Sequence, residues 1–159
     1  MEQVIAAVRG FDSVLVVRPQ PADGCAQPAW GDAFFYYAPA GQVPANVQPY
    51  GTITTRNHPG DTACDLDPPG RWRVNIHVGR AVFVELTGEE PRSLSRPRDH
   101  TAPDSVLPHP LYGPLGWICV VNPGEKTHAT LVRLLRDAHD AARARFERRH
   151  GPDQTAGGN

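Results

Sequence analysis

Hydrophobic and polar residues alternate most clearly over residues 71–79, RWRVNIHVG. The apolar positions are Trp72, Val74, Ile76 and Val78. The polar positions between them are Arg71, Arg73, Asn75 and His77. Successive side chains of a β-strand point to opposite faces of its sheet, so this pattern predicts a strand with one core face and one polar face. The polar face is either exposed to solvent or the floor of a cleft.

Similar patterns predict the other elements. Runs of β-branched and aromatic residues predict strands at 13–18, 33–39, 50–56 and 117–121. Helical spacing predicts short helices at 2–10 and 81–86 and a long helix after residue 122. Strands joined by turns favour an antiparallel sheet, so the predicted fold class is α+β: about five strands, with N- and C-terminal helices packed on one face. The other face is then available to a ligand.

The last helix has the clearest predicted start. Asn122 can cap it, Pro123 suits its first turn, and Glu125 lies three residues after the cap. One apolar stripe follows, made of Leu131, Leu135, Ala138, Ala142 and Phe146. We expect a single domain over residues 1–150 and a disordered tail over 151–159.

Composition narrows the function classes. The chain has 159 residues and a formal net charge of -1, so no overall field draws it to nucleic acid or membrane. It contains 15 glycines and 17 prolines, which indicates many loops. We expect no signal peptide and no membrane partner, because no apolar run approaches the roughly 20 residues of a membrane span. Its cysteines, Cys25, Cys64 and Cys119, are widely spaced, which favours free thiols in the cytoplasm.

One segment resembles a known family. The PHPxYG and WxCVxNP motifs are formed by Pro108, His109, Pro110, Tyr112, Gly113, Trp117, Cys119, Val120, Asn122 and Pro123. With AFFYYAP and LDPPGRWRVNIHVG, they resemble an actinobacterial family catalogued as domain of unknown function 6194, over most of residues 1–145. The order of elements also resembles the YjbR-like fold, some of whose members have been suggested to bind DNA. The resemblance implies a small residue where this chain has His77, so an activity of His77 would belong to this chain alone.

Two histidines are the candidate catalytic residues. His77, two residues from Asn75 and four from Arg73, could act as a general base beside an anion-binding group. The alternative is an ordinary solvated strand face. His109 lies between two prolines that fix its backbone, three residues before Tyr112, and it either serves a site or belongs to a rigid turn.

Other sites are less favoured. Residues 58–67 offer His58, Asp61, Cys64, Asp65 and Asp67, but their spacing matches no metal-ligand pattern, and we predict no metal and no cofactor. Asp65 and Asp67 could instead pair with Arg71 or Arg73. We expect Cys119 to be inert, because it lies in a buried strand. RARFERRH at 143–150 could contact phosphates, yet basic residues also suit a helix C-terminus.

Three functions remain open. The first is binding of a small polar or anionic molecule, with or without cofactor-independent acid–base catalysis. Its residues would be His77 and His109 as catalytic groups, and Arg71, Arg73, Asn75, Tyr36, Tyr112 and Trp30 as ligand-binding groups, with residues 88–105 as a mobile lid. The second is a nucleic-acid-binding module that uses the arginines of the strand and the last helix. The third is a protein-interaction domain without chemistry. The sequence leaves the oligomeric state open.

Overall fold

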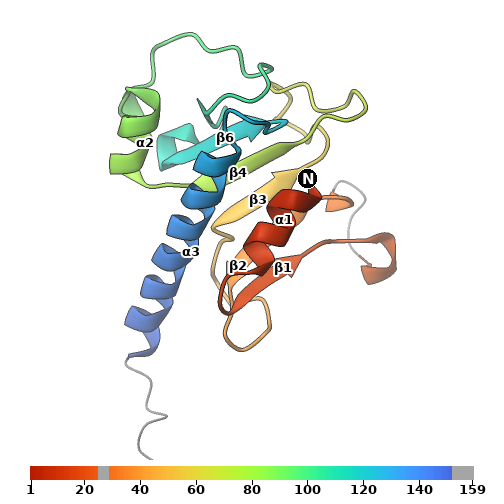
Figure 1. Cartoon of the computed structure of the whole chain (residues 1–159), viewed down its shortest axis with the longest axis vertical. Coiled ribbons are helices and arrows are strands. Elements are labelled where there is room, and N and C mark those ends of the chain that lie inside the picture. Colours follow the sequence, from red (N-terminus) through yellow and green to blue (C-terminus); the bar gives the residue numbers. More distant parts are fainter. Residues whose placement is uncertain (25–28, 152–159) are drawn as a thin grey trace, which may run out of the picture.

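The computed structural model describes residues 1–24 and 29–151, and its fold is α+β (Figure 1). The α-helices in this part of the chain are α1 Glu2–Arg9, α2 Arg80–Thr87 and α3 His128–His150. The strands are β1 Val14–Val17, β2 Ala33–Tyr37, β3 Gly51–Thr54, β4 Arg73–His77, β5 Leu107–Pro108 and β6 Trp117–Val121. The predicted order of elements is correct except for β5, which the sequence did not indicate.

All the strands form one antiparallel sheet in the order β1-β2-β3-β4-β6-β5. The sheet has six strands instead of about five, because Leu107 and Pro108 pair with Cys119 and Ile118. A strand of two residues has no alternation that a sequence pattern could reveal. The predicted strand at 117–121 lies between β4 and β5, as its apolar residues on both faces suggested.

One face of the sheet packs against helices, as predicted. Figure 1 shows α1 and α3 crossing this face, and their apolar residues join the strands in one core. The core includes Val4, Ile5 and Val8 of α1, Leu131 and Leu135 of α3, and Phe35, Ile53, Val74, Ile76, Ile118 and Val120 of the sheet. The opposite face, which carries the polar side of β4, is called the open face below.

The start of α3 differs from the prediction. The helix begins at His128, because Asn122 has a positive φ of 43° and its side chain accepts a hydrogen bond from the backbone N–H of Trp72. The carboxylate of Asp104 accepts the N–H groups of Gly124, Lys126 and Thr127. These bonds hold the segment in a loop ahead of the helix. The predicted stripe is correct in its first half, where Leu131, Leu135 and Ala138 are buried.

Residues 88–105, expected to form a mobile lid, are bonded to one another through Glu89, and to the rest of the fold through Arg98, which donates to the carbonyl of Thr87, and Thr101, whose carbonyl accepts from Arg71. The Glu89 carboxylate accepts hydrogen bonds from the backbone N–H groups of Ser95 and Arg96 and from the guanidinium of Arg98. The Ser95 N–H and the Arg98 guanidinium are the main groups that lower the pKa of Glu89, to about 2. A segment held by this many bonds to one carboxylate is a fixed loop.

Some expectations concern parts of the chain without a structural description. Cys25 and residues 152–159 lie outside the described residues. Among the described residues, no helix is both long enough and apolar enough to cross a membrane.

Candidate functional site

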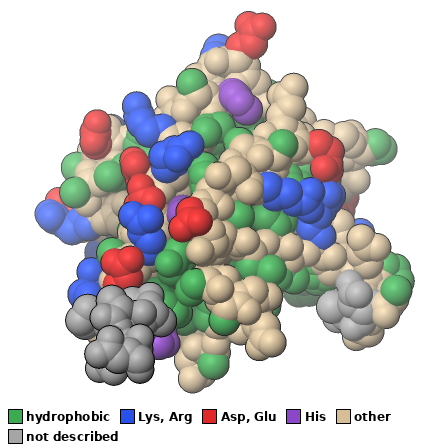
Figure 2. Space-filling model, turned by 60° about the horizontal axis from the view of Figure 1, so that its bottom comes forward, with side chains coloured by type: hydrophobic (Ala, Val, Ile, Leu, Met, Phe, Trp, Pro, Cys, Tyr) green, Lys and Arg blue, Asp and Glu red, His purple; other side chains and the backbone are tan. Residues whose placement is uncertain are grey.

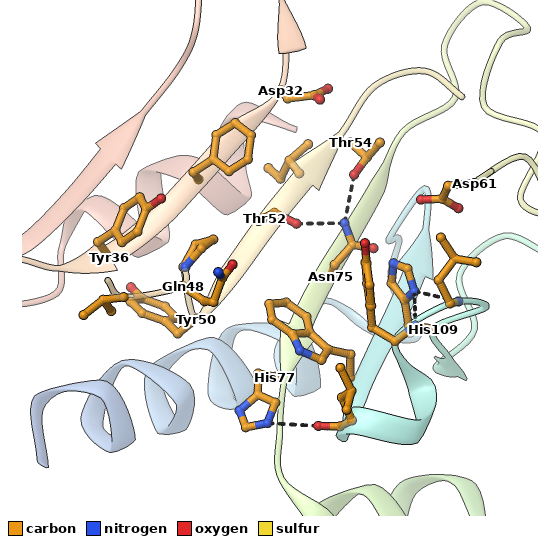
Figure 3. A pocket seen from close by; sticks show the side chains of 18 of the residues that line it. Asp32, Tyr36, Gln48, Tyr50, Thr52, Thr54, Asp61, Asn75, His77 and His109 are labelled. Carbon is orange, nitrogen blue, oxygen red and sulfur yellow. Dashed lines mark hydrogen bonds between the residues drawn. The ribbon is translucent and has the colours of Figure 1, made fainter. Parts of the chain in front are cut away.

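A pocket of about 1080 Å³ lies on the open face of the sheet (Figure 3). Strands β2, β3, β4 and β6 form its floor, with the side chains of Phe34, Tyr36, Thr52, Thr54, Arg73, Asn75, His77 and Trp117. The strand register explains this set, because Thr52 pairs with Asn75, Thr54 with Arg73, and His77 with Trp117, so paired side chains share a face. The polar side of β4 is therefore the floor of a cleft.

Arg73 is buried at one end of the pocket. Its side chain is 1% exposed and its guanidinium binds Asp61 with two bonds, Nη1 to Oδ1 at 2.9 Å and Nη2 to Oδ2 at 2.6 Å. Burial alone would raise the pKa of Asp61, but the bonds and charge of Arg73 outweigh it and lower that pKa. The suggested pairing of Arg73 with Asp65 or Asp67 is wrong, and the charge that was expected to bind an anion is already neutralised by Asp61.

Asn75 lies at the centre of the floor and is 3% exposed. Its Nδ2 group donates to the hydroxyls of Thr52 and Thr54, both at 2.9 Å. These two bonds fix the amide, and Oδ1 has no hydrogen-bond partner among the described residues. Figure 3 shows Asn75 between the two threonines and His109. The amide oxygen is thus a fixed acceptor that lacks a donor.

One ring nitrogen of His109 is already occupied by the backbone. Its Nδ1 accepts the backbone N–H groups of Leu111 and Tyr112, at 3.1 and 3.0 Å, so the ring proton is on Nε2. Burial, helped by the nearby charge of Arg73, lowers the pKa of His109 to about 3. Tyr112 is half exposed and packs on this ring, with the two centroids 4.9 Å apart. The histidine therefore both bonds to the backbone of its own turn and lines the pocket, and its role in a site stays a prediction.

His77 lies at the other end of the floor. Its Nε2 donates to the carbonyl of Leu115 at 3.2 Å, and its ring packs against Trp117. This bond leaves Nδ1 as an acceptor. Burial, together with the positive charge of Arg145, lowers the pKa of His77, so the ring is neutral at pH 7. A neutral imidazole with a free nitrogen is chemically able to accept a proton.

Two predicted ligand-binding residues lie outside the pocket. Arg71 comes before the first residue of β4, and its guanidinium donates to the backbone carbonyls of Cys64, Asp65 and Thr101. It joins loops and does not line the pocket. Trp30 does not line it either, although its neighbour Ala29 does. Tyr36 forms part of the wall, and burial raises the pKa of its hydroxyl.

The structure brings together a histidine–carboxylate pair that sequence reasoning missed. His58 Nε2 lies 3.0 Å from Asp32 Oδ2, and Asp32 Oδ1 also accepts the N–H and hydroxyl of Thr55. Both residues line the pocket. They are 26 positions apart, in different loops, so no spacing rule connects them.

The basic end of α3 also reaches the pocket. Arg145 and Arg149 line it, and neither forms an ion pair with a described residue. Burial and the neighbouring charges of Arg148 and Arg149 lower the pKa of Arg145, which indicates a locally positive potential. The sequence showed this cluster but not that it faces a pocket.

The residues at 58–67 do not converge into a metal site. His58 pairs with Asp32 and Asp61 with Arg73. Within the described ranges, no group of three or more histidine, cysteine, aspartate or glutamate side chains is placed to hold a metal ion.

Comparison with known proteins yields a family. A model described as a family of unknown function, DUF6194, matches residues 1–151. No curated protein and no solved structure matches the chain. The resemblance of the PHPxYG and WxCVxNP motifs to this family is therefore confirmed.

Proposed function

We propose that this protein, which belongs to the DUF6194 family, binds a small polar molecule with an anionic group in the pocket on the open face of its sheet. The observation that carries the proposal is Asn75 Oδ1, a buried acceptor without a donor among the described residues. Burying an unpaired polar atom costs about 1–3 kcal/mol. A ligand that brings an N–H or O–H group to this atom recovers that cost.

The basic side chains support an anionic ligand. Arg73 is neutralised by Asp61, whereas Arg145 and Arg149 have no acidic partner among the described residues. The positive charge therefore lies at the α3 end of the pocket, away from Asn75. A ligand with a hydrogen-bond donor at one end and a carboxylate or phosphate at the other matches this arrangement.

Apolar groups complete the pocket. Phe34, Tyr36 and Trp117 provide aromatic surface beside the polar floor. Leu111 and Leu115 at the rim are 45% and 64% exposed and add apolar surface to the pocket. Small-molecule pockets commonly combine apolar walls with a few polar groups that fix orientation.

A ligand screen by thermal shift tests the proposal. The panel consists of carboxylates and phosphate esters, each paired with a neutral analogue. A ligand that binds the native state raises the Tm, so we expect hits among the anionic members only. Hits confined to neutral compounds, or a complete panel without a hit, would contradict the proposal.

Two variants then locate the hit in the pocket. The double variant Arg145→Gln/Arg149→Gln should raise the dissociation constant about tenfold, as measured by calorimetry. Exposed charge pairs contribute about 0.2–1 kcal/mol each. Arg133→Gln, an exposed arginine on the same helix that does not line the pocket, is the matched control and should bind normally. Asn75→Ala should also weaken binding. Equal affinity in all three variants would place the ligand elsewhere.

Acid–base catalysis in the same pocket is a second candidate, favoured by the contact between His58 and Asp32. A carboxylate that holds one imidazole nitrogen orients the ring and stabilises its protonated form. This pair is better suited to proton transfer than His109, whose Nδ1 is occupied by backbone amides. If a bound compound is converted, Asp32→Asn and His58→Gln should each abolish turnover, whereas His109→Asn should retain part of it.

The alternatives from the sequence receive less support. Arg71 and Arg73 were expected to contribute to a nucleic-acid-binding surface, but their guanidinium groups make contacts within the protein instead. On the face shown in Figure 2, acidic and basic side chains lie side by side and form no continuous basic surface. A protein-interaction domain would need an exposed apolar surface. The exposed apolar side chains near the pocket are Leu111, Tyr112 and Leu115, and they already form its rim.

The proposal also includes the YjbR-like fold and the cytoplasmic location that the sequence suggested. The order of elements supports the YjbR-like resemblance. The free thiols of Cys64 and Cys119 support a cytoplasmic location, where thiols stay reduced.

A further inference from the structure

Two buried cysteines form a pair that the proposed binding function does not use. Cys64 lies between β3 and β4, Cys119 lies in β6, and their side chains are 1% and 0% exposed. Both are free thiols, and the Cys119 Sγ donates to the backbone carbonyl of Pro108 at 3.8 Å. They share a small core with Leu66 and Val121.

The guanidinium of Arg73 lies beside this pair. Its Nη1 is 3.4 Å from Cys64 Sγ, while the same group binds Asp61. A cation beside a sulfur favours the thiolate, the reactive form of cysteine. The interaction with Cys119 and then Arg73 outweigh burial and lower the pKa of Cys64 to about 6, whereas the interaction with Cys64 and burial raise the pKa of Cys119.

We propose that Cys64 and Cys119 form a redox-active dithiol that hydrogen peroxide oxidises to a disulfide. Cys64 is the attacking sulfur, because Arg73 contacts it. Cys119 is the resolving sulfur, because it lies in the same small buried cluster as Cys64.

The two steps balance. The Cys64 thiolate attacks one peroxide oxygen, an S–O bond forms, the O–O bond breaks, and the departing hydroxide takes a proton from solvent to become water. The Cys119 sulfur then attacks the Cys64 sulfenic acid. An S–S bond forms, the S–O bond breaks, and the departing hydroxyl leaves as water with the Cys119 proton. Overall, two thiols are oxidised by two electrons and one peroxide is reduced to two waters.

Burial of the pair determines which oxidants can react. Hydrogen peroxide is about the size of water, and Arg73, which lines the pocket, contacts Cys64 on its buried side. A bulky aromatic disulfide reagent has no comparable access to a sulfur that is 1% exposed. The pair should therefore react with hydrogen peroxide and resist the bulky reagent while the protein is folded.

The test is peptide mapping by mass spectrometry on the full chain, without reduction, after treatment with hydrogen peroxide. We expect a peptide pair joined through Cys64 and Cys119. Cys25→Ser is the matched control and should give the same product. Cys119→Ser should accumulate a sulfenic acid at Cys64 that dimedone labels, and Cys64→Ser should leave Cys119 reduced. The proposal is overturned if both thiols stay reduced, or if Cys64 advances to a sulfinic acid without a disulfide.

A rate measurement on Cys25→Ser keeps the proposal testable if the other variants fail to fold. With a pKa of about 6 at Cys64, the thiolate fraction, and with it the oxidation rate, should rise about tenfold from pH 5 to pH 7 and then level off. A rate that still rises about tenfold between pH 7 and pH 8 would identify an ordinary thiol and contradict the assignment.

Discussion

At the scale of residues, two arginines two positions apart in the sequence have different roles. Arg73 is in β4 and buried against Asp61, whereas Arg71 precedes the strand and holds backbone carbonyls. Alternation placed both on the polar side of the strand. It could not show where the strand begins or which acidic residue a loop would supply, because those depend on contacts distant in sequence.

Asp61→Asn tests the buried pair. The change leaves the Arg73 charge without its counter-ion, and a broken buried pair costs several kcal/mol, so the free energy of unfolding should fall by about 2–4 kcal/mol in urea titrations. Asp65→Asn, the same change in the same loop, is the control, because the Asp65 carboxylate is exposed. Equal losses in the two variants would show that Asp61 does not stabilise Arg73.

At the scale of elements, the strands were predicted better than the long helix. The alternation in β4 is a local property, and its apolar residues Val74 and Ile76 are buried as expected. The start of α3 is a non-local property, since Asp104 binds Gly124 and Thr127 from 20 and 23 residues away. The residues around Asn122 fit the local pattern of a helix start, but the hydrogen bonds from Asp104 hold them in a loop instead.

Asp104→Asn tests the loop ahead of α3. One amide oxygen cannot replace a carboxylate that accepts bonds from Gly124, Lys126 and Thr127, so the Tm should fall by several degrees. The backbone N–H groups of these residues should exchange hydrogen faster. Asp99→Asn is the control, because the Asp99 carboxylate bonds, among the described residues, to the nearby Thr101. Unchanged hydrogen exchange in Asp104→Asn would mean that the Asp104 carboxylate does not stabilise the loop ahead of α3.

At the scale of the whole molecule, histidines link stability to pH. Burial lowers the pKa values of His77, His109 and His139 below the 6.5 of an unfolded histidine. Below pH 6.5 the unfolded chain therefore binds more protons than the folded one. This contribution to stability is complete above pH 6.5 and decreases as the pH falls toward the folded-state values.

His109→Asn isolates the largest of these contributions, because the pKa of His109 is about 3. Asparagine can still accept the N–H groups of Leu111 and Tyr112 but cannot be protonated. Between pH 7 and pH 4.5 the wild-type protein should lose about 2 kcal/mol more unfolding free energy than the variant, as measured by urea titration. Parallel losses would show that His109 is protonated in the folded state.

The candidate site as a whole could be predicted only in part. The sequence located the open face and named Asn75, His77, His109, Tyr36 and Tyr112, all of which line the pocket. It did not find Asp32, Thr52 or Thr54, because a loop and the neighbouring strand β3 bring them beside β4. It showed the basic cluster of Arg145 and Arg149 but not that this helix end faces the pocket.

The short edge strand β5 limits how this sheet can associate with other chains. The N–H of His109 bonds inward to the carbonyl of Trp117, so in an antiparallel pair the nitrogen of the preceding residue points outward. That residue is Pro108, which has no N–H to offer. A strand arriving from a second molecule finds no donor there, which opposes intermolecular sheet extension on this side; among the described strands, the other edge is β1.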